Sequence, residues 1–219
     1  MIVYTPLKTR LGDCIHATSN AIAFAKKHNT KINFAPHEKI MSIDDIFKRR
    51  FSFDTFVCAL QLFNYENYLN IVSVTTPGER VRFHHAKQNF DECRYQWSAK
   101  NTSHNKICYA FNSRSGANKI VTEKDKENLA KLLNNLESKY TTLDCHKFGL
   151  VNSFESTIKE MLASNFFIGT CTGWSHVALA LNMPVELIQM NLPQNKINSW
   201  YKFFNYKMHA SIDDTVNVV

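Results

Sequence analysis

Two short loops of the sequence carry residue types that could perform group-transfer chemistry. In the first loop, Asp13 follows Gly12 and precedes a long helical pattern. A carboxylate in a ligand cleft can accept the proton of an attacking hydroxyl, so Asp13 is a candidate general base. A carboxylate just before a helix can equally cap that helix. The local pattern leaves both interpretations open.

The second loop lies between an apolar strand-like segment and a helical pattern. It contains three hydroxyl residues and a glycine, and it closes on a histidine. Small side chains let backbone N–H groups approach an anion, and a helix N-terminus adds a favourable dipole. The alternative is a plain strand-to-helix turn with a buried histidine. The candidate residues for binding a diphosphate are Thr170, Thr172, Gly173, Ser175 and His176.

A third loop, residues 112–119, contributes positive charge through Arg114 and Lys119. These side chains could pair with the same phosphates, or they could belong to an ordinary basic loop. The sequence has neither G-x-x-x-x-G-K-[ST] nor G-x-G-x-x-G, which disfavours a P-loop ATPase or an ordinary dinucleotide enzyme. No cluster of residues has the spacing of metal ligands, so no metal is predicted.

Strand-like and helix-like segments alternate along the chain, which predicts an α/β protein with open, doubly wound parallel sheets. Ligands of such sheets bind beyond the carboxyl ends of the strands, where the three loops fall. The predicted strands are 2–5, 31–35, 70–74, 106–111, 141–145, 166–169 and, as the last, 184–188. The predicted helices are 15–28, 42–50, 123–138, 153–162 and 173–181; residues 53–63 form a further apolar segment, and 79–104 are polar and mixed.

Composition narrows the class of protein. The chain has 219 residues, 44% of them hydrophobic, and a net charge of +7, which excludes a disordered or low-complexity protein. Six scattered cysteines without a C-x-x-C pair indicate free thiols in a reducing compartment. The apolar stretch 166–188 is interrupted by polar residues and is typical of a buried core. We therefore expect a soluble, cytoplasmic protein whose positive charge suits nucleotide phosphates, an acidic membrane surface or nucleic acid.

The loops together resemble the ADP-heptose:lipopolysaccharide heptosyltransferases, glycosyltransferase family 9, which have the GT-B fold. Members of that family begin with a strand, a Gly-Asp loop and a long helix, as at residues 11–17 here. They end with Asp-Thr-Gly-x-x-His-x-x-x-Ala followed by a Pro-Val strand, which residues 171–180 and 184–185 resemble. The strand and basic loop at 107–119 and the tail at 211–216 are similar to the family as well.

This resemblance implies an α/β, GT-B-like fold with two small Rossmann-like domains, parallel sheets and a cleft between them. The acceptor-side domain would cover residues 1–103, and the domain that binds the nucleotide sugar would cover 104–200. Residues 201–219 would form a C-terminal helix that packs back. The first domain is shorter than is usual in the family.

The resemblance also implies the reaction, which is inverting transfer of a sugar from a nucleotide-diphosphate sugar to a hydroxyl of a saccharide or glycolipid acceptor. No metal or cofactor would take part. Asp13 would be the general base, in an acceptor-side loop with Arg10, Gly12 and His16. Thr172 and Gly173 would hold the donor diphosphate beside His176. Arg114 and Lys119 would neutralise charge on the departing nucleotide.

Some features depart from the family. Cys171 stands where its signature has an acid, and the opening loop and helix are also similar to those of some fucosyltransferases. One alternative is a non-catalytic nucleotide-sugar-binding or glycan-binding protein on a GT-B-like scaffold. A second, motivated by the +7 charge, is a sugar transferase that acts on nucleic acid. A peripheral position at the inner membrane face is a further expectation for a glycolipid acceptor.

Overall fold

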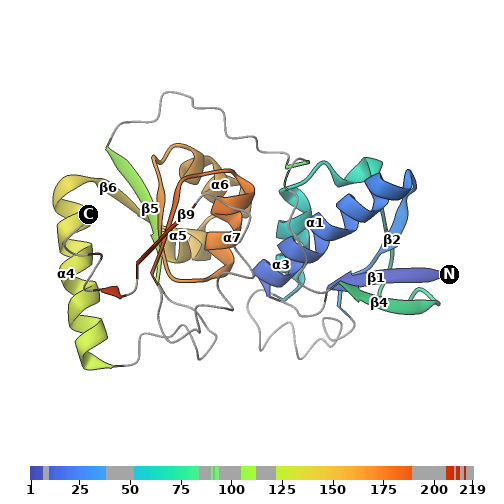
Figure 1. Cartoon of the computed structure of the whole chain (residues 1–219), viewed down its shortest axis with the longest axis horizontal. Coiled ribbons are helices and arrows are strands. Elements are labelled where there is room, and N and C mark those ends of the chain that lie inside the picture. Colours follow the sequence, from blue (N-terminus) through green and yellow to red (C-terminus); the bar gives the residue numbers. More distant parts are fainter. Residues whose placement is uncertain are drawn as a thin grey trace. The chain divides into compact units, whose positions relative to one another are not determined.

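The computed structural model describes residues 1–6, 10–37, 52–83, 90, 92–93, 105–111, 122–188, 206–209, 211–212 and 215. The chain forms two compact units, Met1–Tyr95 and Gln96–Val219, and each has its own parallel sheet (Figure 1). The boundary expected after residue 103 falls outside the described residues, as do the helix predicted at 42–50 and the loop with Arg114 and Lys119.

The first unit has a four-stranded sheet in which all neighbouring strands are parallel. Its order is β3-β2-β1-β4, with β1 at Ile2–Pro6, β2 at Ile32–Phe34, β3 at Leu69–Ile71 and β4 at Glu79–Phe83. Strand β4 was not predicted, because it lies in the segment 79–104, whose polar and mixed sequence shows no strand pattern. It pairs with β1 along the whole of both strands.

The turn before β4 explains how this charged segment joins the sheet. Gly78 has φ +146°, and a Cβ there would lie 2.4 Å from the carbonyl oxygen of Met1, so only glycine fits. The Arg80 guanidinium donates hydrogen bonds to the carbonyl oxygens of Val74 and Thr76. Arg80 is therefore used to hold the turn that sets the register of β4.

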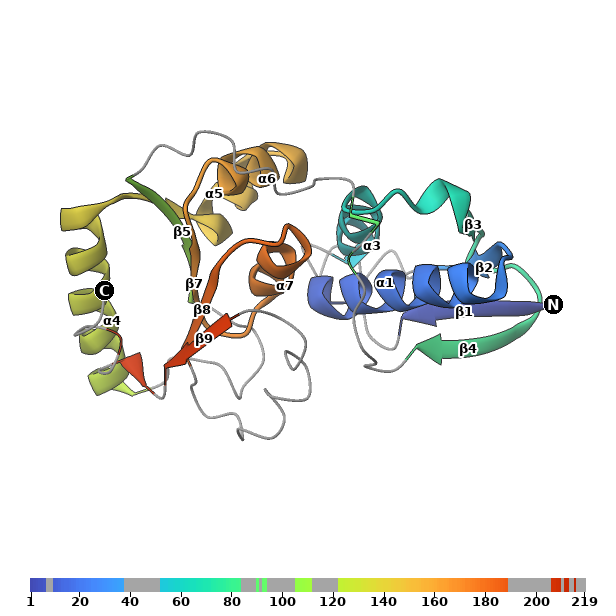
Figure 2. The same cartoon turned by 45° about the horizontal axis from the view of Figure 1, so that its top comes forward.

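Two helices, α1 at Leu11–His28 and α3 at Ser52–Gln61, cover one side of this sheet (Figure 2). A short 3-10 helix, η2, follows at Tyr65–Asn67. Phe34 of β2 stacks on Phe56 of α3 with ring centroids 5.3 Å apart, and Tyr4 contacts Phe24 of α1 at 5.4 Å. The apolar segment at 53–63 is thus a helix whose aromatic side chain packs on the sheet.

The second unit has a five-stranded parallel sheet in the order β6-β5-β7-β8-β9. The strands are β5 at Lys106–Ala110, β6 at Thr141–Asp144, β7 at Phe167–Gly169, β8 at Val185–Ile188 and β9 at Tyr206–His209. The prediction that residues 184–188 form the last strand is wrong, since β9 lies within the segment expected to be a helix. The ring Nε2 of His209 lies 2.7 Å from a carboxylate oxygen of Glu186, which joins β9 to β8.

Helices cover both faces of this second sheet, as predicted for a doubly wound protein. Figure 2 shows α4, at Glu123–Lys139, on one side, and α5, α6 and α7 on the other. These three helices span Cys145–Val151, Phe154–Leu162 and Gly173–Ala180. Helix α5 was not predicted; it begins at Cys145 because the Asp144 carboxylate accepts hydrogen bonds from the N–H groups of His146 and Lys147, both at 3.0 Å.

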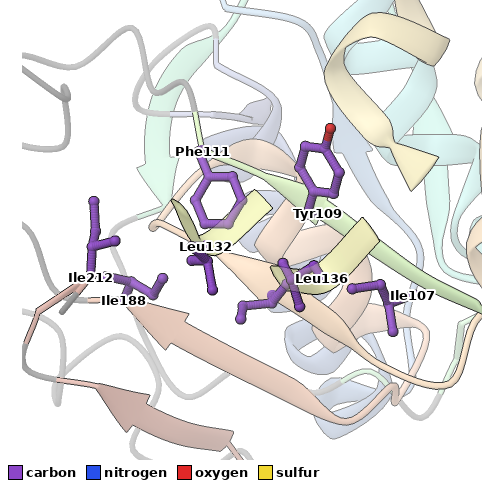
Figure 3. Packing of buried hydrophobic residues seen from close by; sticks show 8 residues of the cluster. Ile107, Tyr109, Phe111, Leu132, Leu136, Ile188 and Ile212 are labelled. Carbon is purple, nitrogen blue, oxygen red and sulfur yellow. The ribbon is translucent and has the colours of Figure 1, made fainter. Parts of the chain in front are cut away.

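A hydrophobic core lies beneath α4. Leu132 and Leu136 are fully buried and pack with Ile107, Tyr109 and other apolar side chains of the sheet (Figure 3). Full burial of one such leucine stabilises the folded state by about 1.5–3 kcal/mol.

Candidate functional site

The order of the strands locates a candidate ligand site in the second unit. Strand β6 lies on one side of β5, whereas β7, β8 and β9 lie on the other side. The direction of winding therefore reverses between β5 and β7. In open α/β sheets, ligands bind beyond the carboxyl ends of the strands at this reversal point. The two strands end there at Ala110 and Gly169, directly before Phe111 and Thr170.

Helix α7 begins at this edge of the sheet with a capping box. The Thr172 hydroxyl accepts from the N–H of Ser175 at 3.4 Å, and the Ser175 hydroxyl accepts from the N–H of Thr172 at 3.0 Å. Each side chain therefore satisfies a backbone group of the other. No described residue accepts from the next two N–H groups, those of Gly173 and Trp174. The helix thus offers two backbone donors at its positive end.

Thr170 and Gly169 have a different environment from the capping box. The Thr170 side chain is fully buried, and its hydroxyl donates to the carbonyl oxygen of Phe111 at 3.1 Å. Its N–H donates to the carbonyl oxygen of Ala110 at 3.2 Å. A Cβ on Gly169 would lie 2.2 Å from that same oxygen, so β7 approaches β5 more closely than any side chain allows. These residues join the two strand ends.

Two further residues of this loop, His176 and Cys171, are buried within the unit. His176 is 7% exposed and Cys171 9% exposed. Trp174 stacks on Phe154 with ring centroids 5.8 Å apart. Sequence reasoning missed Phe154, Gly149 and Gly169, because each of them lies against a residue of another element. Phe154 and Gly149 lie against Trp174 of α7, and Gly169 lies against Ala110 of β5. A glycine inside an apolar strand was the one available signal for a close backbone approach.

In the first unit, Asp13 lies in α1, the helix that follows β1. The direction of winding of this sheet also reverses at β1, since β2 and β3 lie on one side of it and β4 on the other. Helix α1 begins at Leu11 with Arg10 at its N-cap, so Asp13 lies in the first turn and is not the N-cap residue. The capping interpretation is therefore wrong. Gly12 and His16 are buried inside the helix, so their expected place in an acceptor-side loop is wrong. His16 lies one turn further on and is 3% exposed.

Cys14 lies next to Asp13 but is unsuited to nucleophilic chemistry. The pKa of its thiol is raised from 9.0 to about 12, chiefly because burial disfavours the charged thiolate; a hydrogen bond with Thr55 opposes this rise, and the nearby Asp13 carboxylate contributes to it. A thiol with this pKa is protonated at neutral pH and unreactive. All six cysteines are free, as predicted, and all except Cys58 are buried.

Within the described ranges, no group of three or more His, Cys, Asp or Glu residues could hold a metal ion. In the same part of the chain, no helix is long and apolar enough to cross a membrane.

The predicted site residues that the structure describes fall into two groups, one in each unit. Thr170, Thr172, Gly173, Ser175 and His176 share one edge of the second unit, and Arg10, Gly12, Asp13 and His16 share the start of α1 in the first. The predicted roles of these residues in binding and catalysis stay predictions.

The two parallel sheets with helices define a GT-B-like α/β fold, the class to which solved heptosyltransferases belong. The iron-containing dodecameric glycosyltransferase TibC from enterotoxigenic E. coli H10407 matches with a TM-score of 0.53 and 16% identity, over 86% of this chain and 58% of that chain. The dodecameric iron-containing heptosyltransferase TibC in complex with ADP-D-beta-D-heptose matches with a TM-score of 0.53 and 15% identity, over 86% of this chain and 57% of that chain. The E. coli heptosyltransferase WaaC with ADP matches with a TM-score of 0.51 and 13% identity, over 100% of this chain and 98% of that chain.

These likenesses show the fold, and they confirm the predicted fold class. The chain spans less than two thirds of the length of TibC. No family model and no curated protein match the sequence.

Proposed function

We propose that this protein is a glycosyltransferase that moves a sugar from a nucleotide-diphosphate donor to a hydroxyl of a saccharide or glycolipid acceptor. The observation that carries this proposal is the start of α7. Two N–H groups, those of Gly173 and Trp174, lie at a helix N-terminus, at the reversal point of a parallel sheet. A diphosphate carries the negative charge and the acceptor oxygens that such a terminus binds.

The solved structures of similar fold support the donor class. One TibC structure contains ADP-D-beta-D-heptose and the WaaC structure contains ADP. We therefore propose an ADP-linked or related sugar as the donor, with no metal or cofactor in the step. Membership of glycosyltransferase family 9 is part of this proposal.

The proposed step is a direct displacement. The acceptor hydroxyl oxygen attacks the anomeric carbon, and the bond from that carbon to the diphosphate oxygen breaks. The nucleoside diphosphate leaves with the electron pair, and the Asp13 carboxylate takes the proton of the hydroxyl. Attack opposite the leaving group inverts the anomeric configuration. Arg114 and Lys119 would stabilise the charge that develops on the leaving diphosphate.

Donor binding can be tested by isothermal titration with ADP. Gly173 is the first residue of α7, where proline is well tolerated, and Thr172 before it has the extended backbone that a following proline requires. Gly173→Pro therefore deletes one N–H and leaves the helix intact. We expect it to weaken ADP binding roughly 10-fold or more, because a hydrogen bond to a charged group contributes about 1.5–3 kcal/mol.

The matched control is Gly173→Ala, which adds a Cβ but keeps the N–H group. If both variants bind ADP equally, the N–H of Gly173 does not contact the donor. If the wild-type protein binds neither ADP nor other nucleoside diphosphates, the donor assignment is wrong.

Turnover is tested by ADP release from ADP-heptose in the presence of saccharide acceptors. We expect Asp13→Asn to lower kcat by roughly 10²–10⁴-fold and to leave donor affinity unchanged. The control is Glu123→Gln, which removes another first-turn carboxylate, on α4, and should leave kcat unchanged. Full activity of Asp13→Asn would overturn the base assignment, and donor binding without turnover would favour a non-catalytic binding protein.

A further inference from the structure

The Thr170 hydroxyl lies at the edge where the proposed donor site forms, but it cannot act as a phosphate ligand. A hydroxyl has one hydrogen to donate, and Thr170 gives it to the carbonyl oxygen of Phe111 at 3.1 Å. Phosphate oxygens accept hydrogen bonds and do not donate them. The Thr170 side chain is also fully buried.

The acceptor of this bond explains why the hydroxyl is present. The ladder between β5 and β7 ends where the N–H of Thr170 reaches the carbonyl oxygen of Ala110. Phe111 is the next residue, and it is 4% exposed. A buried carbonyl just beyond a ladder needs a donor from a side chain. Thr170 supplies that donor and extends the connection between the strands by one residue.

The connection has a direct consequence for α7. Thr170 is held by its N–H, by its hydroxyl and by the close approach of Gly169 to Ala110. Only Cys171 separates it from Thr172, the N-cap of the helix. The direction in which the first N–H groups of α7 point is therefore fixed relative to the end of β5.

We propose that Thr170 is a positioning residue: its bond to Phe111 orients the N-terminus of α7, and nucleotide affinity depends on a hydroxyl that does not touch the nucleotide. This inference rests on the proposed function for its ligand, and it reassigns Thr170 from the diphosphate-binding set.

The test uses three variants of the full chain. Thr170→Val keeps the shape of the side chain and deletes the hydroxyl, whereas Thr170→Ser keeps the hydroxyl. Thr157→Val is the matched control, because Thr157 is equally buried and donates to the Ser153 carbonyl at 3.0 Å within one helix. All three are compared with wild type well below their melting temperatures.

Two readouts are measured. The first is the amide NMR shift and hydrogen exchange of Gly173 and Trp174 without nucleotide, which we expect to change in Thr170→Val and to stay at wild-type values in Thr170→Ser and Thr157→Val. The second is the Kd for ADP, which we expect to rise roughly 10-fold in Thr170→Val alone, since small misplacements of a binding group have large effects.

The readouts separate this inference from the proposed function. Unchanged amides in Thr170→Val would overturn the positioning role, and so would equal changes in Thr157→Val. Changed amides together with an unaltered Kd would also overturn it. Failure of wild type to bind ADP would refute the proposed donor, and the amide readout would still decide whether Thr170 orients the helix.

Discussion

Gly169→Ala is the substitution whose cost follows most directly from the geometry. The added Cβ would lie 2.2 Å from the carbonyl oxygen of Ala110, and 3.0 and 3.1 Å from its carbonyl carbon and nitrogen. All three are backbone atoms of the neighbouring strand, so no side chain can rotate away. Ordinary contact begins near 3.4 Å, so β5 and β7 would have to separate by about 1 Å.

That separation would disrupt two hydrogen bonds of Thr170, from its N–H to Ala110 at 3.2 Å and from its hydroxyl to Phe111 at 3.1 Å. Each contributes about 1 kcal/mol net, and the steric strain adds about 1–3 kcal/mol. We therefore expect the free energy of unfolding to fall by about 3–5 kcal/mol, and the melting temperature by roughly 10 °C.

The assay is urea unfolding together with calorimetry. Asn134→Ala is the control, because Asn134 is exposed on α4 and alanine there should be neutral or stabilising by a few tenths of a kcal/mol, about 0.5 at most. The reasoning is refuted if Gly169→Ala melts within about 2 °C of wild type, a shift too small for the expected loss.

Three further predictions concern stability. A Cβ on Gly149 would lie 2.7 Å from Cζ2 of Trp174, so we expect Gly149→Ala to destabilise by about 1–2 kcal/mol in urea, although alanine normally favours a helix; a stabilised variant would contradict this. The raised pKa of Cys14 means that the unfolded thiol ionises first above pH 9.0. The free energy of unfolding should therefore fall as the pH rises from 9.0 to about 12, and it should fall less steeply in Cys14→Ala. Equal slopes in wild type and variant would argue against a raised pKa of Cys14. A hydrogen bond from Lys26 at 2.7 Å lowers the pKa of Glu92. Glu92→Gln should therefore lower the free energy of unfolding by less than about 1 kcal/mol at neutral pH and leave it unchanged in strong acid. If the difference between variant and wild type were the same at both pH values, the ion pair with Lys26 would not be the cause of the loss.

Local signals in the sequence were sufficient for many elements. Two helix caps are examples: the Thr122 hydroxyl accepts from the N–H of Asp125 at 3.0 Å, and Ser153 caps α6 in the same way. Caps are readable because donor and acceptor lie three residues apart. The two strands that sequence reasoning missed, β4 and β9, depend on partners distant in the chain, the strands β1 and β8.

The same distinction between local and long-range contacts applies to the candidate site. The capping box of Thr172 and Ser175 joins two residues of one turn, so the residue types indicated a helix N-terminus there. The role of Thr170 could not be read from the sequence, because its hydroxyl bonds to Phe111, which is 59 residues away and directly follows β5. The sequence alone could not exclude the capping interpretation of Asp13, because it does not mark the start of α1, which begins at Leu11.

The sequence by itself determined the alternation of strands and helices, the loops that follow the strands, and the resemblance of those loops to a sugar transferase family. These follow from side-chain periodicity and from capping interactions within a few residues. Only the tertiary structure decided the strand order, which places the winding reversal between β5 and β7, and the close approach of Gly169 to Ala110. Strand pairing and backbone contact join segments far apart in the chain, so their geometry exists only when both segments are packed together.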